Sequence, residues 1–343
     1  MTMKRRDSEE SIGPDRIFEM FHGLWVSGIL RAAVELDVFT AIAEGSTTVE
    51  AIAAKIKASR RGTRILLNAL GALDLVWKRK ESYGLEPIAD TFLVRGKEAY
   101  IGDFSSAVPL AHWEAFGKMA EAVKKGAPVC DFLTHESEEW EQVAVALVPL
   151  GIPVARSLGD MLGIGREGRS GCTILDVACG SGVYGYTLLQ QDSRATVTGI
   201  DRENVLKVAA RVARDMGVAE RVTHRPGDIL TMDCGHSEFD IAIVSHILQG
   251  FSAAQGRGIL EKVHDALVPG GIVVINDFVA DEDRCTRRFP LLFACYMLLV
   301  TPEGDTYTFS EFKSWLDAIG FHNTTKHEVP GESTLIVASK KRP

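Results

Sequence analysis

A glycine-rich loop that follows an acidic residue is the first feature able to do chemistry. Residues 173–178 (TILDVA) have the apolar pattern of a buried strand, and residues 179–185 (CGSGVYG) lead from it into a predicted helix. Glycines at such a turn let a ligand approach the backbone, and free N–H groups at the helix N-terminus attract an anion. The spacing Gly180-x-Gly182-x-x-Gly185 also matches the dinucleotide-binding fingerprint, but this pattern alone has low specificity.

Three aspartates fall at or near the ends of successive predicted strands. Asp176 can bind a cationic amino group beside the loop, and Asp201 ends ATVTGID about 20 residues further on, where a carboxylate binds ribose hydroxyls. Asp228, in a turn after the third strand, can accept an adenine amino proton while Ile229 packs on the ring. Each aspartate alone could be a cap or turn residue. Together, without a basic cluster for a pyrophosphate, they indicate S-adenosylmethionine rather than NAD.

Length and composition bound the class of protein. The chain has 343 residues, of which 46% are hydrophobic and 24% charged, so we expect a folded protein of two domains. Lys and Arg number 38 against 46 Asp and Glu, a net charge of −8 that disfavours nucleic acid as a partner.

Targeting and redox signals point to the cytoplasm. The first ten residues lack the apolar core of a signal peptide, and the apolar run 289–300 is too short to span a bilayer. Six cysteines are scattered without a CxxC pair, which fits a reducing compartment and gives no support to a metal site. We therefore expect a cytoplasmic protein with no bound metal and no membrane partner.

The sequence pattern divides the chain into three predicted segments. Residues 15–105 form a mainly helical winged-helix domain, residues 106–165 a helical connector that lines a substrate pocket, and residues 166–343 an α/β domain that binds the cofactor. Four glycines within residues 163–171 mark the linker before the α/β part.

The N-terminal segment predicts either a dimerisation scaffold or a DNA-binding module. Its first helix, from Ile17 to Ile29, is apolar enough to bury a second face against another subunit, although it could simply be a core helix. A capping box at 47–50 and a cap at Ser59 start two helices, and VWKRKE and SYGLEP read as two short strands. The acidic total favours the scaffold. DNA binding would use three arginines of the second helix: Arg60, Arg61 and Arg64.

Several motifs resemble those of class I S-adenosylmethionine-dependent methyltransferases. ELDVFTAIAEG, DVACGSGVYG, LVPGG and MLLVTPEGDTYTFSEFKSWLDAIGF resemble the small-molecule O-methyltransferase family, which includes caffeate, flavonoid and acetylserotonin methyltransferases. The resemblance as a whole covers roughly residues 15–340. The resemblance implies an α/β, Rossmann-like, doubly wound methyltransferase domain with the cofactor at the carboxyl ends of its strands. It also implies a domain-swapped homodimer built by the winged-helix domain.

The residue types and the resemblance together assign two binding groups. The cofactor group is Asp176, Gly180, Gly182, Asp201, Arg202, Asp228, Ile229 and Ser245. The acceptor group is Trp113, Phe116, Phe293, Tyr296 and Met297. The alternative for the acceptor group is an ordinary helical core. Arg287 and Arg288 could bind an acidic acceptor or be solvated.

The chain departs from the family at the catalytic base. Where O-methylating relatives carry a histidine after the fourth strand, this sequence has Gln249, whose amide cannot take a proton near neutral pH. His246 lies three residues earlier and would face the same pocket on a helical exit. We therefore take His246 and Gln249 as the candidate catalytic residues.

Three explanations of the missing histidine stay open. The acceptor could have no proton to lose, as a thioether sulfur, or be an acidic enol or phenol, so that catalysis rests on proximity. Another residue could be the base, with His22, His112 and His246 as candidates. The fold could also host changed chemistry, a hydroxylase or decarboxylase.

We therefore predict an S-adenosylmethionine-dependent methyltransferase that acts on oxygen or sulfur of a small molecule. Two rival functions are a NAD-dependent oxidoreductase, from the glycine fingerprint, and a winged-helix regulator that senses S-adenosylmethionine.

Overall fold

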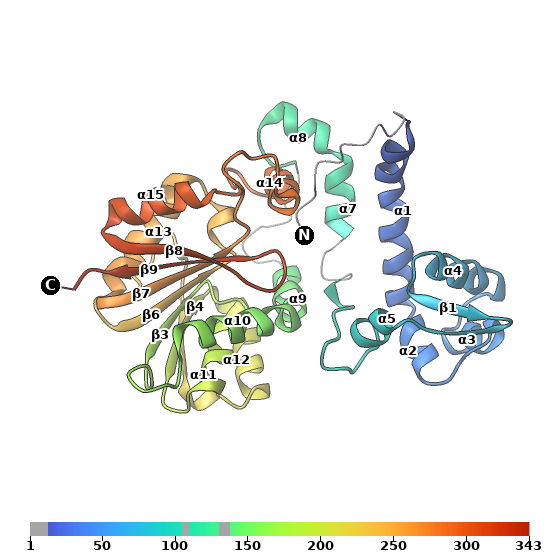
Figure 1. Ribbon diagram of the computed structural model, residues 1–343, viewed down its shortest axis with the longest axis horizontal. Helices are drawn as coiled ribbons and strands as arrows, with labels where there is room; N and C mark the ends of the chain where they lie inside the picture. The colour runs from blue at the N-terminus through green and yellow to red at the C-terminus, as the bar shows by residue number, and fades with distance from the viewer. Residues whose placement is uncertain (1–12, 105–109, 130–137, 343) are drawn as a thin grey trace. The chain divides into compact units, whose positions relative to one another are not determined.

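The computed structural model describes residues 13–104, 110–129 and 138–342 of the chain. Two compact units make up the fold, residues 1–106 and residues 107–343, and each is described by itself (Figure 1). The first unit is mainly helical, and the second holds the large sheet.

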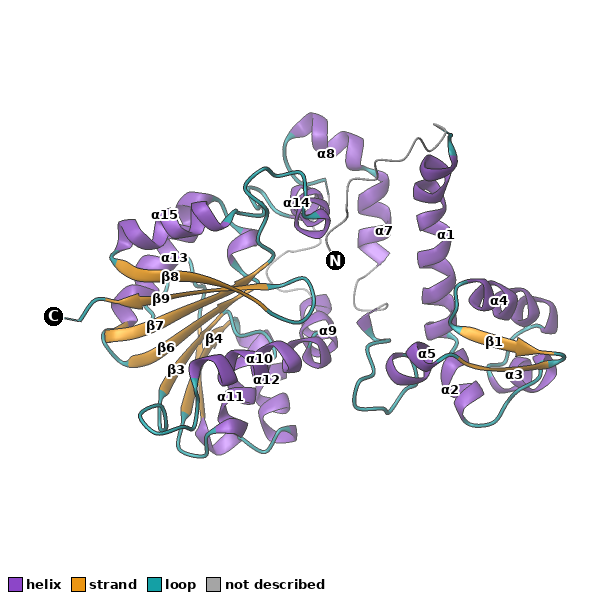
Figure 2. Cartoon of the chain, in the orientation of Figure 1, coloured by secondary structure: helices purple, strands orange, loops and turns teal. Residues whose placement is uncertain are grey.

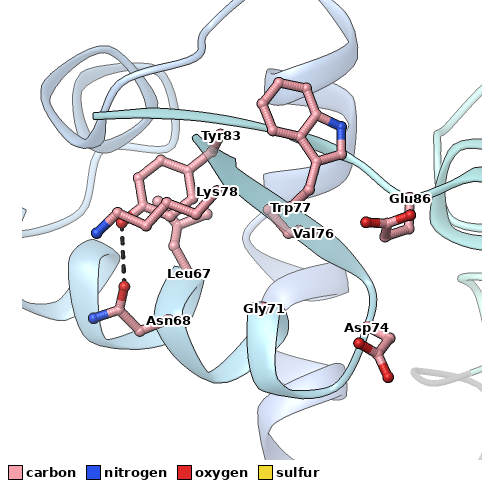
Figure 3. A pocket seen from close by; sticks show the side chains of 9 residues that line it. All are labelled: Leu67, Asn68, Gly71, Asp74, Val76, Trp77, Lys78, Tyr83 and Glu86. Carbon is pink, nitrogen blue, oxygen red and sulfur yellow. Dashed lines mark hydrogen bonds between the residues drawn. The ribbon is translucent and has the colours of Figure 1, made fainter. Parts of the chain in front are cut away.

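The first unit is a winged-helix arrangement, as predicted. Its described elements are α1 (Asp15–Glu35), α2 (Val38–Ala43), α3 (Val49–Lys55), α4 (Arg60–Ala72), β1 (Val76–Arg79), β2 (Ser82–Leu85) and α5 (Pro87–Phe92). The antiparallel pair β1–β2 forms the wing. Tyr83 of the wing is buried and donates its hydroxyl to Asn68 Oδ1 of α4 at 3.2 Å, which ties the wing to the helix (Figure 3).

The caps of two helices test local predictions. Ser59 accepts a hydrogen bond from the Gly62 amide and starts α4, as expected. The capping box at residues 47–50 is wrong by one position, because Thr48 is the N-cap and accepts from the Ala51 amide. Glu50 is then one position too early to return the bond, and it pairs with Arg60 instead.

Helix α1 carries a long exposed apolar surface. Phe21 is 70% exposed and Trp25 63%, and most apolar side chains of the helix outside its last turns are exposed too. The helix is also long and apolar enough to cross a membrane by length and composition, an option that the sequence analysis did not consider. Such a surface requires a cover, since single exposed apolar residues are common but contiguous ones are not.

A mostly parallel sheet of seven strands organises the second unit (Figure 2). Its order is β5-β4-β3-β6-β7-β9-β8, with β9 antiparallel to both its neighbours. The strands are β3 (Thr173–Val177), β4 (Thr196–Asp201), β5 (Val222–Pro226), β6 (Phe239–Ser245), β7 (Leu267–Asp277), β8 (Phe321–Glu328) and β9 (Thr334–Lys340). The order reverses between β3 and β6, which is the usual place for a ligand in such sheets.

Two details of the sheet differ from the sequence prediction. The LVPGG segment, whose proline and two glycines are typical of a turn, belongs instead to strand β7, where Gly270 has a φ of +84° and the pairing with β6 is irregular near Phe239. Strand β8 was not predicted, because every residue in it after Phe321 is polar, and it forms by pairing with β9 at the sheet edge.

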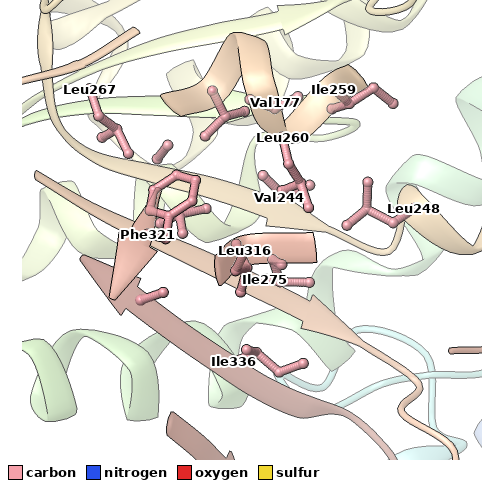
Figure 4. Close-up of a cluster of buried hydrophobic side chains, with 14 of the residues drawn as sticks. Val177, Val244, Leu248, Ile259, Leu260, Leu267, Ile275, Leu316, Phe321 and Ile336 are labelled. Carbon is pink, nitrogen blue, oxygen red and sulfur yellow. The ribbon is translucent and has the colours of Figure 1, made fainter. Parts of the chain in front are cut away.

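Helices cover both faces of the sheet. The described helices are α7 (Leu110–Gly117), α8 (Met119–Lys125), α9 (Glu138–Ala146), α10 (Val148–Leu162), α11 (Val183–Gln191), α12 (Glu203–Asp215), α13 (Ala253–Ala266), α14 (Arg288–Val300) and α15 (Phe309–Ile319). Val244 and Ile275 face α13 and α15 on one side (Figure 4), while Ile243 and Val274 face the α10–α12 side. Burial on both faces explains the continuous apolar strands.

Candidate active site

The glycine-rich loop crosses from β3 to α11 in a conformation that favours glycine. Gly180 has a φ of +58° and Gly182, the N-cap of α11, a φ of +76°. A Cβ atom at Gly182 would collide with the Tyr186 ring below it. The loop therefore keeps its backbone bare and leaves the α11 N-terminus as a place for the polar part of a ligand.

Asp201 ends β4 with its carboxylate fixed in place. Its Oδ2 accepts the Gly180 amide at 2.8 Å, and its Oδ1 accepts the Arg202 amide at 2.7 Å. Burial raises the pKa of Asp201, and these two hydrogen bonds oppose that rise. The carboxylate thus joins the glycine loop to the start of α12, which begins after Arg202.

Asp176 lies in β3 below the same loop. It is 1% exposed, and its Oδ2 accepts the Gly185 amide at 3.1 Å. Burial raises the pKa of Asp176 to about 7, although the Gly185 N–H lowers it. A nearby ammonium group would favour the ionised form of this carboxyl.

The remaining predicted cofactor residues lie at adjoining strand ends. Asp228 Oδ1 accepts the Leu230 amide at 2.9 Å in the turn after β5, and Ile229 is buried next to it. Ser245 ends β6, where its Oγ accepts from Asn276 Nδ2 at 2.9 Å. The sheet thus brings the predicted cofactor residues to the carboxyl ends of four neighbouring strands, which suits S-adenosylmethionine.

The exit from β6 holds both candidate catalytic residues. His246 adopts a left-handed conformation with a φ of +51°, and a 3₁₀ turn (Leu248–Gly250) follows, so the expected helical exit is wrong. Burial lowers the pKa of His246 to about 4, which makes the ring a weak base. The Gln249 amide donates weakly to the His246 carbonyl at 3.4 Å, and its Oε1 has no partner.

A polar network that the sequence analysis missed surrounds His246. Its Nε2 lies 3.2 Å from both Asn276 Nδ2 and Ser333 Oγ. The Tyr184 hydroxyl joins the same network through Ser245 and Asn276. The signal in the sequence was the pair Asn276-Asp277 at the end of an otherwise apolar strand, the same signal that pointed to Asp176.

A chain of ring contacts runs from the glycine loop to α7, and we call it the aromatic wall. Successive ring centroids are 4.5–6.5 Å apart in the pairs that form it, His246–Phe278 at 4.5 Å and Phe278–Phe293 at 4.8 Å among them. The members are Tyr184, His246, Phe278, Phe289, Phe293, Tyr296 and Phe116. Tyr184, Phe278 and Phe289 were not predicted.

The predicted acceptor residues do not all have the same environment. Phe116 and Trp113 on α7 are about half exposed, and Phe293 and Tyr296 on α14 are part of the wall. Met297 is 4% exposed and belongs to the small core shared by α7, α8 and α14.

Other residues considered from the sequence have different surroundings. Arg287 donates to Thr334 Oγ1 at 2.6 Å and to the Glu332 carbonyl at 3.0 Å, so it anchors the start of β9. His22 stacks on Trp25 in the first unit, and the side chain of His112 lies outside the described residues. Within the described parts of the chain, no three His, Cys, Asp or Glu residues are grouped as a metal site.

Fold and site define a Rossmann-like, nucleoside-binding methyltransferase domain preceded by a winged-helix unit. Two family models match the chain, "Methyltransferase domain" over residues 169–309 and "O-methyltransferase dimerisation domain" over residues 18–95. The chain therefore belongs to the small-molecule O-methyltransferase family, and it is a methyltransferase that uses S-adenosyl-L-methionine.

Known relatives span the whole chain. The tetracenomycin polyketide synthesis 8-O-methyl transferase of Streptomyces glaucescens is 27% identical and covers 96% of this chain and 98% of its own length. The 3-hydroxy-5-methyl-1-naphthoate 3-O-methyltransferase of Streptomyces sahachiroi is also 27% identical, with 95% of each chain covered. A crystal structure of a candidate O-methyltransferase from Nostoc punctiforme is 30% identical, has a TM-score of 0.89 and covers 96% of this chain and all of its own.

Proposed function

We propose that the protein transfers a methyl group to a hydroxyl oxygen of a small, flat aromatic acceptor. The aromatic wall beside the ends of β6 and β7 carries this proposal, because stacked rings bind flat aromatic molecules. Relatives named for a polyketide and a hydroxynaphthoate support the same acceptor class. The comparisons give no support to the oxidoreductase, regulator or changed-chemistry alternatives.

The residues present fit the cofactor. Asp201 would hold the ribose, since two backbone amides already orient its carboxylate. Asp176 would face the ammonium group, and Asp228 with Ile229 would take the adenine. The bare backbone of the glycine loop would lie along the methionyl part, with Arg202 and Ser245 at its borders. When bound, S-adenosylmethionine supplies an electrophilic methyl group on a sulfonium sulfur.

The protein's contribution to rate would be mainly alignment. The wall would hold the acceptor ring so that its oxygen lies in line with the methyl group, and such positioning can supply several kcal/mol of the barrier. Neither predicted catalytic residue would remove a proton efficiently, because Gln249 has no basic atom and His246 has a low pKa. We assign both to the lining of the reaction site.

We propose that α1 covers its apolar surface against a second copy in a homodimer. The match to a dimerisation domain over residues 18–95 and the exposed side chains of α1 favour a second protein copy, rather than a membrane, as the partner of this surface. We also keep the domain limits 15–105, 106–165 and 166–343 as a proposal, with the middle segment lining the acceptor site. The cytoplasmic location is a proposal as well.

A methyl-transfer assay that detects S-adenosylhomocysteine tests the function. Wild type and Gln249→His would be given hydroxynaphthalenes and hydroxyanthraquinones in one pool, and thioethers and thiols in another. We expect turnover in the first pool, increased by the new histidine. Turnover of thioethers alone, unchanged in the variant, would show a sulfur methyltransferase and overturn the proposal.

A further inference from the structure

Buried polar atoms without a hydrogen-bond partner gather where β6 and β7 end. Of the eight such side-chain atoms among the described residues, four lie here: His246 Nδ1, Gln249 Oε1, Asn276 Oδ1 and Asp277 Oδ2. A buried polar group without a hydrogen-bond partner destabilises the folded protein. A ligand that brings hydrogen-bonding groups to this place explains the concentration.

Asp277 is the most costly of these groups to leave unpaired. It is 2% exposed, its Oδ1 accepts the Phe278 amide at 2.8 Å, and no cationic side chain pairs with it in the part of the chain that the structure describes. A buried carboxylate without a cation is unstable unless it can take up a proton. Burial indeed raises the pKa of Asp277 to about 7, although the backbone N–H groups of Phe278 and Gln249 lower it.

The position of Asp277 joins the two halves of the site. Asn276 pairs in register with Ser245 at the end of β6, so Asp277 lies one residue beyond this cofactor candidate. The next residue, Phe278, contributes the central ring of the aromatic wall. The backbone N–H of Gln249 reaches Asp277 from the β6 exit.

We propose that Asp277 is the proton acceptor of the reaction, an inference that rests on the proposed methylation of an aromatic hydroxyl. As the acceptor O–H bond breaks, the proton moves to Asp277 Oδ2. The electron pair left on oxygen forms the new O–CH₃ bond, while the pair of the breaking S–CH₃ bond stays on sulfur as S-adenosylhomocysteine. The carboxylic acid then returns its proton to water.

The groups around Asp277 define how a pH profile is interpreted. Tyr307 lies near it on the segment before α15, and its pKa is raised to about 12, chiefly by burial; His246 has a pKa of about 4. Neither changes its protonation near pH 7. Asp305, whose amide donates to the Gln249 carbonyl, is half exposed. Asp176 also titrates near 7, but it would act on cofactor affinity.

Asp277→Asn, which keeps the shape of the side chain, tests the role through turnover of 2-naphthol. We expect kcat to fall about 100-fold, the usual scale of general-base catalysis, with an unchanged Kd for S-adenosylhomocysteine. The loss should shrink across 2-naphthols with electron-withdrawing substituents, because an ionised acceptor needs no base. Adding Gln249→His should restore part of the rate. Asp192 is a buried carboxyl residue near the start of β4, away from the proposed site, so Asp192→Asn should leave kcat unchanged.

Two results would overturn the assignment. An equal loss of kcat for every naphthol would show that Asp277 has a structural role. Naphthol turnover that is unaffected by Asp277→Asn would show that Asp277 is not the proton acceptor, while the proposed function would stand. Turnover of thioethers alone would instead overturn the proposed function, and this inference with it.

A measurement on the cofactor-free protein needs no acceptor. The pKa of Asp277 is higher in the folded than in the unfolded chain, so the folded state binds more protons between about pH 4 and 7. Wild type should therefore lose stability relative to Asp277→Asn as pH rises to about 7, with a constant difference above it. A difference that does not change with pH would overturn the proposal.

Discussion

Asp201→Ala should separate cofactor binding from folding. Because two backbone amides hold the Asp201 carboxylate at 2.8 and 2.7 Å, it needs no rearrangement to meet a ribose. Two charge-assisted hydrogen bonds to the ribose hydroxyls, at about 1.5 kcal/mol each, give about 3 kcal/mol. That corresponds to about a 100-fold rise in Kd.

A matched control keeps the loss of affinity apart from the loss of stability. Asp192 also accepts two backbone amides, from Gly171 at 2.6 Å and Arg194 at 3.0 Å, but it lies near the amino ends of strands β3 and β4, away from the proposed site. Asp192→Ala should therefore lower the unfolding temperature about as much as Asp201→Ala does. Only Asp201→Ala should weaken binding.

Titration calorimetry with S-adenosylhomocysteine, together with thermal unfolding of the three proteins, makes the comparison. A Kd for Asp201→Ala within about 3-fold of wild type would refute the assignment of the ribose to this carboxylate. Equal losses of affinity in both variants would show that general destabilisation, and not a ribose contact, is the cause.

Three further predictions concern charge, the wall and assembly. Affinity for S-adenosylhomocysteine should rise about tenfold from pH 6 to 8 by calorimetry, because the ionised Asp176 binds the ammonium group, and Asp176→Asn should abolish this rise. Phe293→Ala should raise the KM for 2-naphthol about fivefold through lost ring contacts, whereas Leu292→Ala, an exposed neighbour on α14, should not. Trp25→Glu should convert a dimer to a monomer in light scattering, whereas Val123→Glu, which is equally exposed on α8, should leave the dimer intact.

Stability should also respond to pH with opposite signs at two groups. Ionisation of Asp277 removes stability as pH rises through about 7, whereas His246, buried as the neutral ring, adds stability as pH rises from about 4 to 6.5. Comparison of each variant with wild type by denaturant unfolding isolates the two contributions. A rise of wild-type stability relative to Asp277→Asn above pH 6.5 would contradict the sign for Asp277.

Local sequence was enough to predict where the proposed cofactor residues lie in the fold. An apolar strand that meets a glycine loop fixes its own geometry, so Asp176, Gly180 and Gly182 could be placed from their neighbours alone. Asp201 and Asp228 followed from the same rule, because parallel strands of one sheet bring their carboxyl ends to one edge.

The arrangement of the proposed acceptor residues depends on tertiary structure. Phe278 and Phe293 come from different elements, and only packing brings their rings to 4.8 Å. The left-handed turn at His246 depends on its amide, which donates to the Asn276 carbonyl in the neighbouring strand, so no local pattern announced it.

The sequence by itself thus determined the class of fold and the cofactor, and it shows that Gln249, which has no basic atom, follows the fourth strand of the sheet along the chain. The structure decided where β8 pairs, how β7 continues through a proline and two glycines, and that Asp277 is buried with no cationic side chain beside it among the described residues. The physical reason is the range of the interactions. Loops and strand ends are set by residues a few positions apart, whereas burial of Asp277 and contact between rings depend on segments distant in the chain.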